Sequence, residues 1–503
     1  MSSLTPLDLE RPPELGTPRR LLVLLALALV AVAWWQVIDL GDGFAVTTVA
    51  VTTEEQPGVP MDLLVPAGAA DAPGVVVAHG FSGSRQLMRS TGLALAEAGF
   101  VVAVVDLSGH GANPTPLIRD DDGAQLTDDV LAGVDALVGT EVVDADRIGV
   151  LGHSMGSGAV LRAGMADPGR IGAVVAVSPT DAEVTPESPG DLLLLAGALE
   201  PRYAALGLDL LERAGGEDPA GARGPRRAFE LIDGVEHVTI LFSRQMHATA
   251  AGFLAVSLAH DAEPLPGGLP PIGWWVVHLV GVLLLWRMVA PLLADRGAPA
   301  TATGRGVVGA VLGALMATAL LAVATAAVEL TGAGGMLVGP VLAVWFLLAG
   351  SAWLWFGPRP QAPRWRDAAW AGVLVAVLVT AFGVLGSRVW LPGAPSGLRL
   401  GLAVAFVPAV LPWSLGVATT IQGPRGWRAV GWWALLLVVL TGGLAVAANV
   451  LEPLRFLLLL LPLIPAVLTA AVVAFLPLQR PWAAAGATSV LLAWLMAVLL
   501  PLV

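Results

Sequence analysis

The sequence Gly152-His153-Ser154-Met155-Gly156 follows an apolar run, Arg147 to Leu151, and precedes a helix-like segment, Ser157 to Ala166. A serine on a sharp turn between a strand and a helix needs strained backbone and little side-chain bulk two residues away on each side. Gly152 and Gly156 stand at those positions. The first N–H groups of the following helix would point toward a developing oxyanion. The stretch therefore predicts a turn that presents Ser154 as a nucleophile, although an ordinary strand-to-helix turn uses the same residue types.

The composition predicts an integral membrane protein. The 503 residues are 56% hydrophobic and 13% charged, with a mean hydropathy of +0.77, which is too apolar for a soluble protein of this size. All 27 basic residues are arginine, which suggests GC-rich bacterial coding, and the net charge of -12 argues against a nucleic-acid partner. The chain has no cysteine, so disulfides, thiolate nucleophiles and cysteine-ligated metals are excluded. Without an HExxH motif or zinc-like ligand spacing, we expect no metal and no other cofactor.

The N-terminal part predicts a membrane anchor. Residues 1–20 are polar and proline-rich, and residues 21–38 form an apolar stretch long enough to cross the ~30 Å hydrocarbon core as a helix. Arg19 and Arg20 precede this stretch, so the positive-inside rule predicts a cytoplasmic N-terminal tail and an extracytoplasmic segment after the anchor. A signal peptide cleaved after Ala31-Val32-Ala33 is the alternative. We favour the uncleaved anchor because the apolar run continues beyond that site.

Residues 44–260 have the composition of a soluble α/β domain, in which short apolar runs alternate with longer helical patterns. We predict strands at residues 44–51, 61–65, 75–78, 101–105, 147–151, 173–177, 192–196 and 228–232. We predict helices at residues 87–98, 126–138, 157–166, 203–214 and 244–258. Strands with helices between the later ones imply a doubly wound, mostly parallel sheet with Ser154 after the fifth strand. The connection from Ser178 to Asp191 is too short to hold a large cap.

After a short linker at residues 261–271, residues 272–502 predict a second membrane part. Eight apolar runs of near-spanning length occur at about 272–293, 306–328, 336–356, 368–390, 400–421, 429–449, 456–476 and 482–502. If residues 44–260 lie outside the cytoplasm, the inner ends carry Arg296, Arg305, Arg359, Arg364, Arg366, Arg425, Arg428 and Arg480. The outer loops carry only Arg388, Arg399 and Arg455. This asymmetry predicts a multi-pass plasma-membrane protein whose α/β domain is extracytoplasmic.

Acyl transfer by a serine also needs donors for the oxyanion, and two loops offer them. The sequence His79-Gly80-Phe81-Ser82-Gly83 follows the third predicted strand, where backbone can supply one donor. We predict the N–H groups of Phe81 and Met155 as the oxyanion-binding pair. A plain glycine turn at residues 79–83 remains the alternative.

The acid that orients the base is expected at the end of a later strand. The strand at 192–196 leads into a turn that carries Glu200 at the carboxyl edge of the sheet. A solvated loop glutamate is the simpler interpretation of such a residue taken alone. Asp181, after the sixth strand, is the rival acid.

The base is expected after the last strand, and His237 follows the strand at 228–232. The other histidines are less well placed: His79, His110 and His153 belong to other loops, His247 to a helix, His260 to the linker and His278 to a span. The order Ser154, Glu200, His237 is the serine, acid, histidine order of α/β-hydrolases.

Residues 44–260 thus resemble the α/β-hydrolase fold enzymes of the serine esterase, lipase and aminopeptidase-like group. The resemblance is carried by His79-Gly80-Phe81, Asp106-Leu107-Ser108-Gly109-His110-Gly111, Gly152-His153-Ser154-Met155-Gly156 and Gly234-Val235-Glu236-His237. It covers under half of the chain. In the resembling group the Asp106 loop is structural, so we expect Asp106 to fix its loop as an acceptor and not to serve as the acid. The chain departs from the group in its glutamate acid and in the absence of a large cap.

These patterns predict a membrane-embedded serine hydrolase that cleaves an ester through a Ser154-His237-Glu200 triad and an acyl-enzyme. The expected partners are a lipid or acylated substrate and membrane lipids, and the outer surface of the bundle is expected to supply part of the site. An acyltransferase that uses the same acyl-enzyme is one alternative. A transporter or scaffold with a regulatory hydrolase-like domain is the other. The sequence leaves the oligomeric state open.

Overall fold

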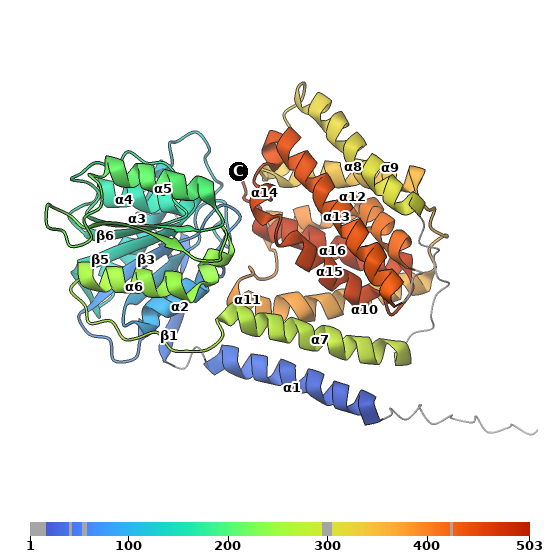
Figure 1. The fold of residues 1–503 in the computed structure, drawn as a ribbon, viewed down its shortest axis with the longest axis horizontal. Coiled ribbons are helices and arrows are strands. Elements are labelled where there is room, and N and C mark those ends of the chain that lie inside the picture. Colours follow the sequence, from blue (N-terminus) through green and yellow to red (C-terminus); the bar gives the residue numbers. More distant parts are fainter. Residues whose placement is uncertain (1–16, 40–42, 53–57, 294–303, 423–425) are drawn as a thin grey trace, which may run out of the picture.

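The structure, a computed structural model, describes residues 17–39, 43–52, 58–293, 304–422 and 426–503. Most of the predicted N-terminal tail, Arg296 and Arg425 lie outside these ranges. Two parts lie side by side: an α/β domain and a bundle of long helices (Figure 1).

The α/β domain contains one sheet of eight strands in the order β1-β2-β4-β3-β5-β6-β7-β8. The strands are β1 (Phe44–Val51), β2 (Val59–Pro66), β3 (Ala72–Ala78), β4 (Val101–Val105), β5 (Val143–His153), β6 (Ile171–Val177), β7 (Asp191–Gly197) and β8 (Arg227–Ile232). β2 is antiparallel to both of its neighbours, β1 and β4, and every pair from β4 to β8 is parallel. The predicted fold class, a mostly parallel doubly wound sheet, is confirmed.

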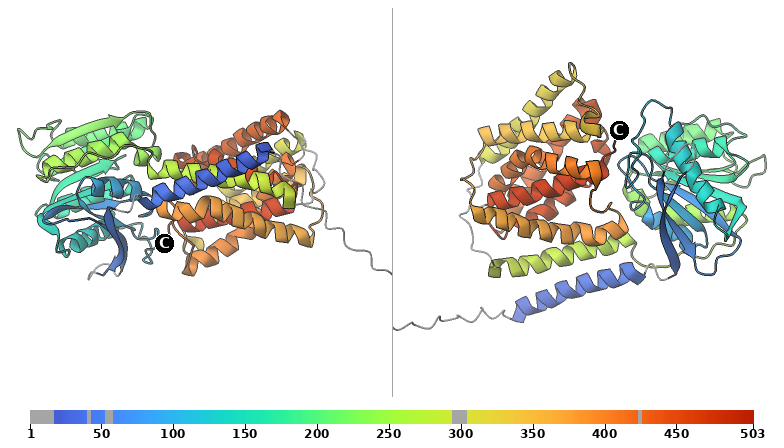
Figure 2. Two further views of the ribbon diagram at one scale, coloured as in Figure 1. Left: turned by 90° about the horizontal axis from the view of Figure 1, so that it is seen from below. Right: turned by 180° about the vertical axis from the view of Figure 1, so that it is seen from behind.

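Helices cover both faces of this sheet (Figure 2). The helices are α2 (Arg89–Glu97), α3 (Ala124–Val138), α4 (Met155–Ala166), α5 (Pro201–Arg213) and α6 (Arg244–Ser257). Strand alternation explains the two layers, since Val76 and Ala78 pack with α3 and α4 while Val75 and Val77 pack with α2 and α6. A strand buried on both faces reads as a continuous apolar run, as β3 and β4 do.

The strands and helices of this domain lie where the sequence predicted them, within a few residues. The largest shift that affects the site is at β5, which extends to His153, so α4 begins at Met155 and not at Ser157. The first turn of α4 contains glycine and serine, whose low helix propensity hid its start. Ser154 consequently stands directly between strand and helix.

The bundle consists mostly of long, apolar helices. They are α1 (Thr17–Asp39), α7 (Pro271–Leu293), α8 (Gly304–Thr325), α9 (Gly339–Phe356), α10 (Trp365–Leu378), α11 (Leu385–Val389), α12 (Gly397–Ile421), α13 (Trp427–Val450), α14 (Leu457–Leu460), α15 (Ile464–Phe475) and α16 (Pro481–Leu499). Among the described residues, 8 helices can span a membrane by length and composition, or up to 9 if one bent pair counts as a span. The predicted anchor, α1, lies beside α7 along one edge of the bundle (Figure 1).

Two predicted spans are not regular helices. Residues 379–384 form a π-helix between α10 and α11, and two of their carbonyls accept hydrogen bonds from Trp275 and His278 of α7. The predicted span at 456–476 is broken between α14 and α15, which meet at a bend of 74°. Pro462 lies at this break, and proline lacks the N–H that would continue the helix.

The bent pair α14 and α15 nevertheless links the two ends of the bundle. Arg480, just before α16, forms an ion pair with Asp367 in the first turn of α10 (3.1 Å), and Trp482 donates to the carbonyl of Gln361 (2.6 Å). α10 and α16 therefore begin at the same end of the bundle. The other end faces the α/β domain.

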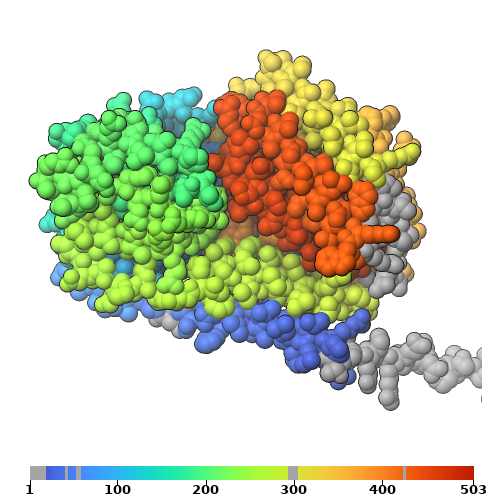
Figure 3. All heavy atoms as spheres, viewed as in Figure 1, coloured from blue at the N-terminus to red at the C-terminus, as the bar shows by residue number. Residues whose placement is uncertain are grey.

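The α/β domain packs directly against that end of the bundle (Figure 3). The contacts lie in loops at the carboxyl edge of the sheet. Phe81, after β3, contacts Phe456, just before α14, with ring centroids 5.3 Å apart. Arg399 at the start of α12 and residues 501–503 reach the loop after β4. The bundle thus covers the loops after β3 and β4 at this edge of the sheet.

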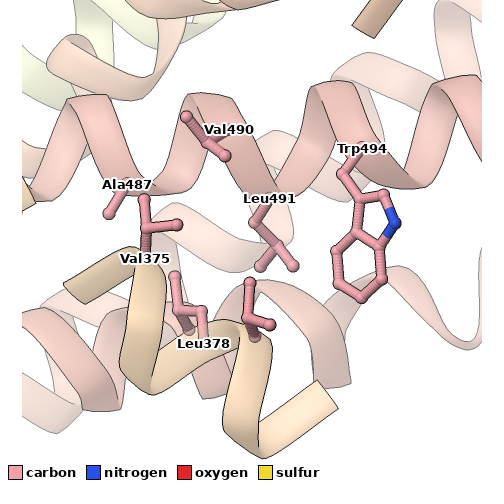
Figure 4. Close-up of a pocket in the computed structure, with 7 residues that line it drawn as sticks. Val375, Leu378, Ala487, Val490, Leu491 and Trp494 are labelled. Atoms are coloured by element: carbon pink, nitrogen blue, oxygen red, sulfur yellow. The ribbon is translucent and has the colours of Figure 1, made fainter. Parts of the chain in front are cut away.

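A small pocket opens elsewhere, between α10 and α16 (Figure 4). Its lining is wholly apolar and consists of Val375, Leu378, Val379, Ala487, Val490, Leu491 and Trp494. None of these is a predicted site residue, and the lining offers no group for chemistry.

Candidate active site

Ser154 lies on a strained turn between β5 and α4. Its backbone has φ 52° and ψ -120°, a conformation that is rare for a residue with a side chain. A Cβ on Gly152 would lie 2.2 Å from the carbonyl oxygen of Gly156, and a Cβ on Gly156 would lie 2.5 Å from that of His79. Both glycines are therefore required by close backbone packing, as the motif predicted.

The structure brings Ser154, His237 and Glu200 into one hydrogen-bonded row. The Ser154 Oγ lies 3.0 Å from Nε2 of His237, and Nδ1 of His237 lies 2.8 Å from Oε2 of Glu200. All three residues are buried, with exposed fractions of 8%, 5% and 6%. With Nδ1–H donating to the carboxylate, Nε2 is free to accept the Ser154 proton.

Two donors hold the Glu200 carboxylate. Its Oε1 accepts from the Ser178 hydroxyl (2.6 Å) and from the N–H of Gly197 (2.6 Å), so Oε2 remains for His237. Asp181, the rival acid, instead forms an ion pair with Arg213, and its side chain is 74% exposed. The structure thus joins Glu200, and not Asp181, to the histidine.

The N–H groups of Phe81 and Met155 lie beside Ser154 in space. Met155 is the first residue of α4, so its N–H has no partner within the helix. Gly80 lies against the serine, because a Cβ there would be 2.9 Å from the Ser154 Cβ. This close approach places Gly80, and with it the peptide group that carries the Phe81 N–H, beside Ser154.

His79 fixes the orientation of that peptide. Its Nδ1 lies 2.8 Å from the Gly80 carbonyl oxygen, and its Nε2 accepts from the Leu107 N–H at 3.1 Å. The carbonyl of Gly80 and the N–H of Phe81 belong to the same planar peptide group, so a bond to one sets the direction of the other. Burial lowers the pKa of His79, which favours the neutral ring that this pattern needs.

Asp106 fixes the loop after β4, as the sequence predicted. Its carboxylate pairs with the Arg85 guanidinium and accepts from the N–H groups of Arg85 (2.7 Å) and Ala112 (2.9 Å). Asp62 of β2 binds the same guanidinium at 3.0 Å. Asp106 is fully engaged in this network and does not contact His237 in the hydrogen bonds of the described residues.

Two residues beside the triad were not predicted from the sequence to belong to the site. Tyr203, the only tyrosine of the chain, stacks on the His237 ring, with ring centroids 4.3 Å apart. His153 packs on the other side, with ring centroids 4.7 Å apart, and its Nε2 lies 2.8 Å from the His237 carbonyl oxygen. Burial lowers the pKa of His153 well below its usual value, so His153 is neutral. The only sequence feature that could have placed Tyr203 at the site was its position, three residues after Glu200.

Part of the chain is similar in sequence to known enzymes. Residues 71–214 match the sequence profile of the serine aminopeptidase S33 family. A bis(hydroxyethyl) terephthalate hydrolase from Streptomyces coelicolor is 39% identical over 98 residues, which are 19% of this chain and 29% of that protein. The chain thus spans less than a third of the length of this curated relative.

Solved structures with a similar fold include a dienelactone hydrolase from Anabaena variabilis and the esterase LipW from Mycobacterium marinum. The first is 22% identical, with a TM-score of 0.34, and the match covers 44% of this chain and 100% of that one. The second is 16% identical, with a TM-score of 0.35, and the match covers 47% and 90%. With its sheet order, its strained serine turn and its S33 profile match, the segment 44–260 has an α/β-hydrolase fold and is similar to the serine aminopeptidases.

Proposed function

We propose that this protein is a membrane-embedded serine hydrolase that cleaves carboxylic esters. The observation that carries the proposal is the row from Ser154 through His237 to Glu200, with contacts of 3.0 Å and 2.8 Å. The similarity to a terephthalate ester hydrolase supports an ester as the substrate class.

The proposed reaction follows from the hydrogen bonds that join Ser154, His237 and Glu200. Nε2 of His237 takes the hydroxyl proton of Ser154 as Oγ attacks the carbonyl carbon, and the N–H groups of Phe81 and Met155 bind the resulting oxyanion. The alcohol leaves with the proton from His237, which forms the acyl-enzyme. Water then gives a proton to His237 and attacks the acyl carbon, and Ser154 Oγ leaves and regains the proton. Glu200 holds the ring and stabilises its cation in both halves.

We further propose that the substrate is a lipid or another acylated molecule that reaches Ser154 beside the bundle. The contact between Phe81 and Phe456 supports this idea, because Phe456 opens an apolar sequence, Leu457 to Leu461, at the edge of the site. The buried triad also favours a substrate that arrives from an apolar environment. In this proposal α1 is the anchor and residues 272–502 are the membrane part, with residues 261–271 as the link.

The proposal is tested by labelling the full-length protein in detergent or vesicles with a fluorophosphonate probe. The wild type is expected to label and to release free acid from p-nitrophenyl esters, whereas Ser154→Ala does neither. Ser257→Ala, which removes a hydroxyl without a hydrogen-bond partner among the described residues at the end of α6, controls for the loss of a hydroxyl. Labelling that persists in Ser154→Ala would reject the triad.

Product analysis with an added alcohol separates the alternative functions. Transfer of the acyl group to the alcohol without free acid would indicate an acyltransferase, and no turnover of any ester would favour a scaffold.

A further inference from the structure

Arg399 connects the bundle to the hydrolase domain with its guanidinium. This side chain is 7% exposed and donates to three carbonyl oxygens. Nη1 bonds the carbonyls of Ala497 and Leu500 at 2.7 Å each, and Nη2 bonds the carbonyl of Gly109 at 2.7 Å. Gly109 lies in the loop after β4, so one buried cation ties the end of α16 to the catalytic domain.

Residues 501–503 make a second connection at the same place. On the bundle side, Leu337 N–H donates to the Pro501 carbonyl (3.0 Å) and Val503 N–H to the Gly335 carbonyl (3.1 Å). On the hydrolase side, Leu502 N–H donates to the Gly109 carbonyl (2.8 Å), and Leu117 N–H donates to the Leu502 carbonyl (2.9 Å). The Gly109 carbonyl oxygen thus receives two donors, one for each lone pair. A Cβ at Gly109 would lie 2.5 Å from the Leu502 oxygen, so the approach needs glycine.

The loop held in this way packs on the oxyanion loop. His110, the next residue, places its ring 5.2 Å from that of His79 and 5.7 Å from that of Phe81. His79 also accepts from Leu107 of the same loop and contacts the Gly80 carbonyl, which sets the Phe81 N–H. A continuous series of contacts therefore runs from Arg399 to one proposed oxyanion donor.

We infer that the Arg399 guanidinium and the backbone N–H of Leu502 are positioning elements of the hydrolase, through which the membrane bundle aligns the Phe81 N–H with the oxyanion. This inference rests on the proposed function, whose oxyanion site it deepens. It gives the bundle a role in the chemical step as well as in anchoring. Because oxyanion donors act on the transition state more than on bound substrate, their misalignment lowers kcat and leaves KM nearly unchanged.

The decisive variant is Leu502→Pro in the full-length protein, because proline removes the N–H that bonds Gly109. Two matched controls isolate this bond. Leu502→Ala removes the side chain and keeps the N–H, and Val503→Pro removes only the N–H that bonds Gly335 within the bundle. With a short soluble p-nitrophenyl ester, Leu502→Pro is expected to lose about tenfold to a hundredfold in kcat, with little change in KM. Both controls are expected to stay near wild type.

Arg399 gives an independent test by chemical rescue. Arg399→Ala is expected to lose at least as much kcat as Leu502→Pro, and added guanidinium is expected to restore part of it, while sodium at equal ionic strength restores nothing. If Arg399→Ala does not fold, the kcat of Leu502→Pro alone tests the inference. Wild-type kcat in Leu502→Pro, or an equal loss in Val503→Pro, would overturn the inference. A wild-type rate in Ser154→Ala would instead overturn the proposed function, so the two failures are distinguishable.

Discussion

At the scale of single residues, Glu200 is the catalytic assignment that a variant can test most directly. Glu200→Gln keeps a side chain that can accept from Ser178 and Gly197, but it loses the charge that faces His237. We expect kcat to fall by up to about 10⁴-fold, because the carboxylate sets the imidazole tautomer and stabilises its cation. The measurement is steady-state hydrolysis of a soluble ester.

Asp181→Asn is the matched control, since it changes the rival acid and breaks only an exposed pair with Arg213. It is expected to retain wild-type kcat. The reverse pattern, a crippled Asp181→Asn with an active Glu200→Gln, would move the acid to the end of β6.

Tyr203 supplies a second prediction at this scale. Its ring stacks on the His237 ring, with centroids 4.3 Å apart and the two planes at 25°, and so restrains the orientation of the imidazole. Tyr203→Phe keeps this stack and is expected to stay near wild-type kcat. Tyr203→Ala removes the stack and is expected to lower kcat about twofold to tenfold, the range of a typical aromatic pair. Steady-state hydrolysis of a p-nitrophenyl ester measures both, and a wild-type rate in Tyr203→Ala would contradict this role.

The proximity of Ser154, Glu200 and His237 was predictable from sequence because each of them follows a strand at the carboxyl edge of one sheet. Ser154, Glu200 and His237 follow β5, β7 and β8, and chain order with strand spacing places all three together. Tyr203 was not predictable in the same way. Its contact depends on the direction in which α5 leaves Glu200, which no periodicity specifies. The ring of Phe81 likewise meets Phe456 only through the docking of two domains.

At the scale of elements, the turn from β5 to α4 tolerates no side chain at its glycines. A Cβ on Gly156 would lie 2.5 Å from the His79 carbonyl oxygen and 2.8 Å from that of Ala78. Gly156→Ala is therefore expected to destabilise the domain by about 1–3 kcal/mol or more, the cost of overpacking a rigid site. It should also abolish labelling of Ser154. The denaturant midpoint and probe labelling measure the two effects.

Gly252→Ala is the matched control in α6. This glycine is exposed, and an added Cβ meets nothing within 4 Å. We expect a stabilisation of about 0.5–1 kcal/mol, because alanine loses less conformational freedom than glycine in a helix. Equal behaviour of the two variants would show that the turn is not under packing strain.

Hydropathy does not predict the irregular parts of the bundle helices. Apolar length alone predicted each segment that lies in the bundle, but it could not show the π-helix at residues 379–384 or the bend after α14. The π-helix depends on donors from another helix, Trp275 and His278. Pro462 was visible in the sequence, yet proline inside an apolar run is compatible with a straight, kinked or broken span.

At the scale of the whole molecule, the contacts between the two parts fit one orientation. Arg399, Phe456 and Leu502 all meet the hydrolase domain from one end of the bundle, while Asp367 and Arg480 pair at the other. With the arginine asymmetry, this predicts an extracytoplasmic hydrolase domain. Reporter fusions after Gly43 and after Arg296 are expected to report opposite sides of the membrane. Equal signals at both positions would contradict the orientation.

We expect the protein to lose stability in acid, because several histidines are buried as neutral rings. Burial lowers the pKa of His79, of His110 and His153 more strongly, and of His247 to about 4. Below pH 6.5 the unfolded chain binds protons at these positions and the folded chain does not, so stability falls as pH falls. For His247 alone, the full difference corresponds to about 3 kcal/mol.

One buried carboxyl group works against this trend. Burial raises the pKa of Asp129 to about 7, so the folded chain binds an extra proton there between pH 7 and 3.8, and stability rises as pH falls. Because four histidines oppose it, we expect a net loss of stability from pH 6.5 toward pH 4, measured as the urea midpoint of the full-length protein. His247→Gln, which keeps a donor for the Leu241 carbonyl, should flatten this dependence, and Asp129→Asn should steepen it. A midpoint that rises on acidification, or that neither variant alters, would mean that these groups are not held in the states their burial implies.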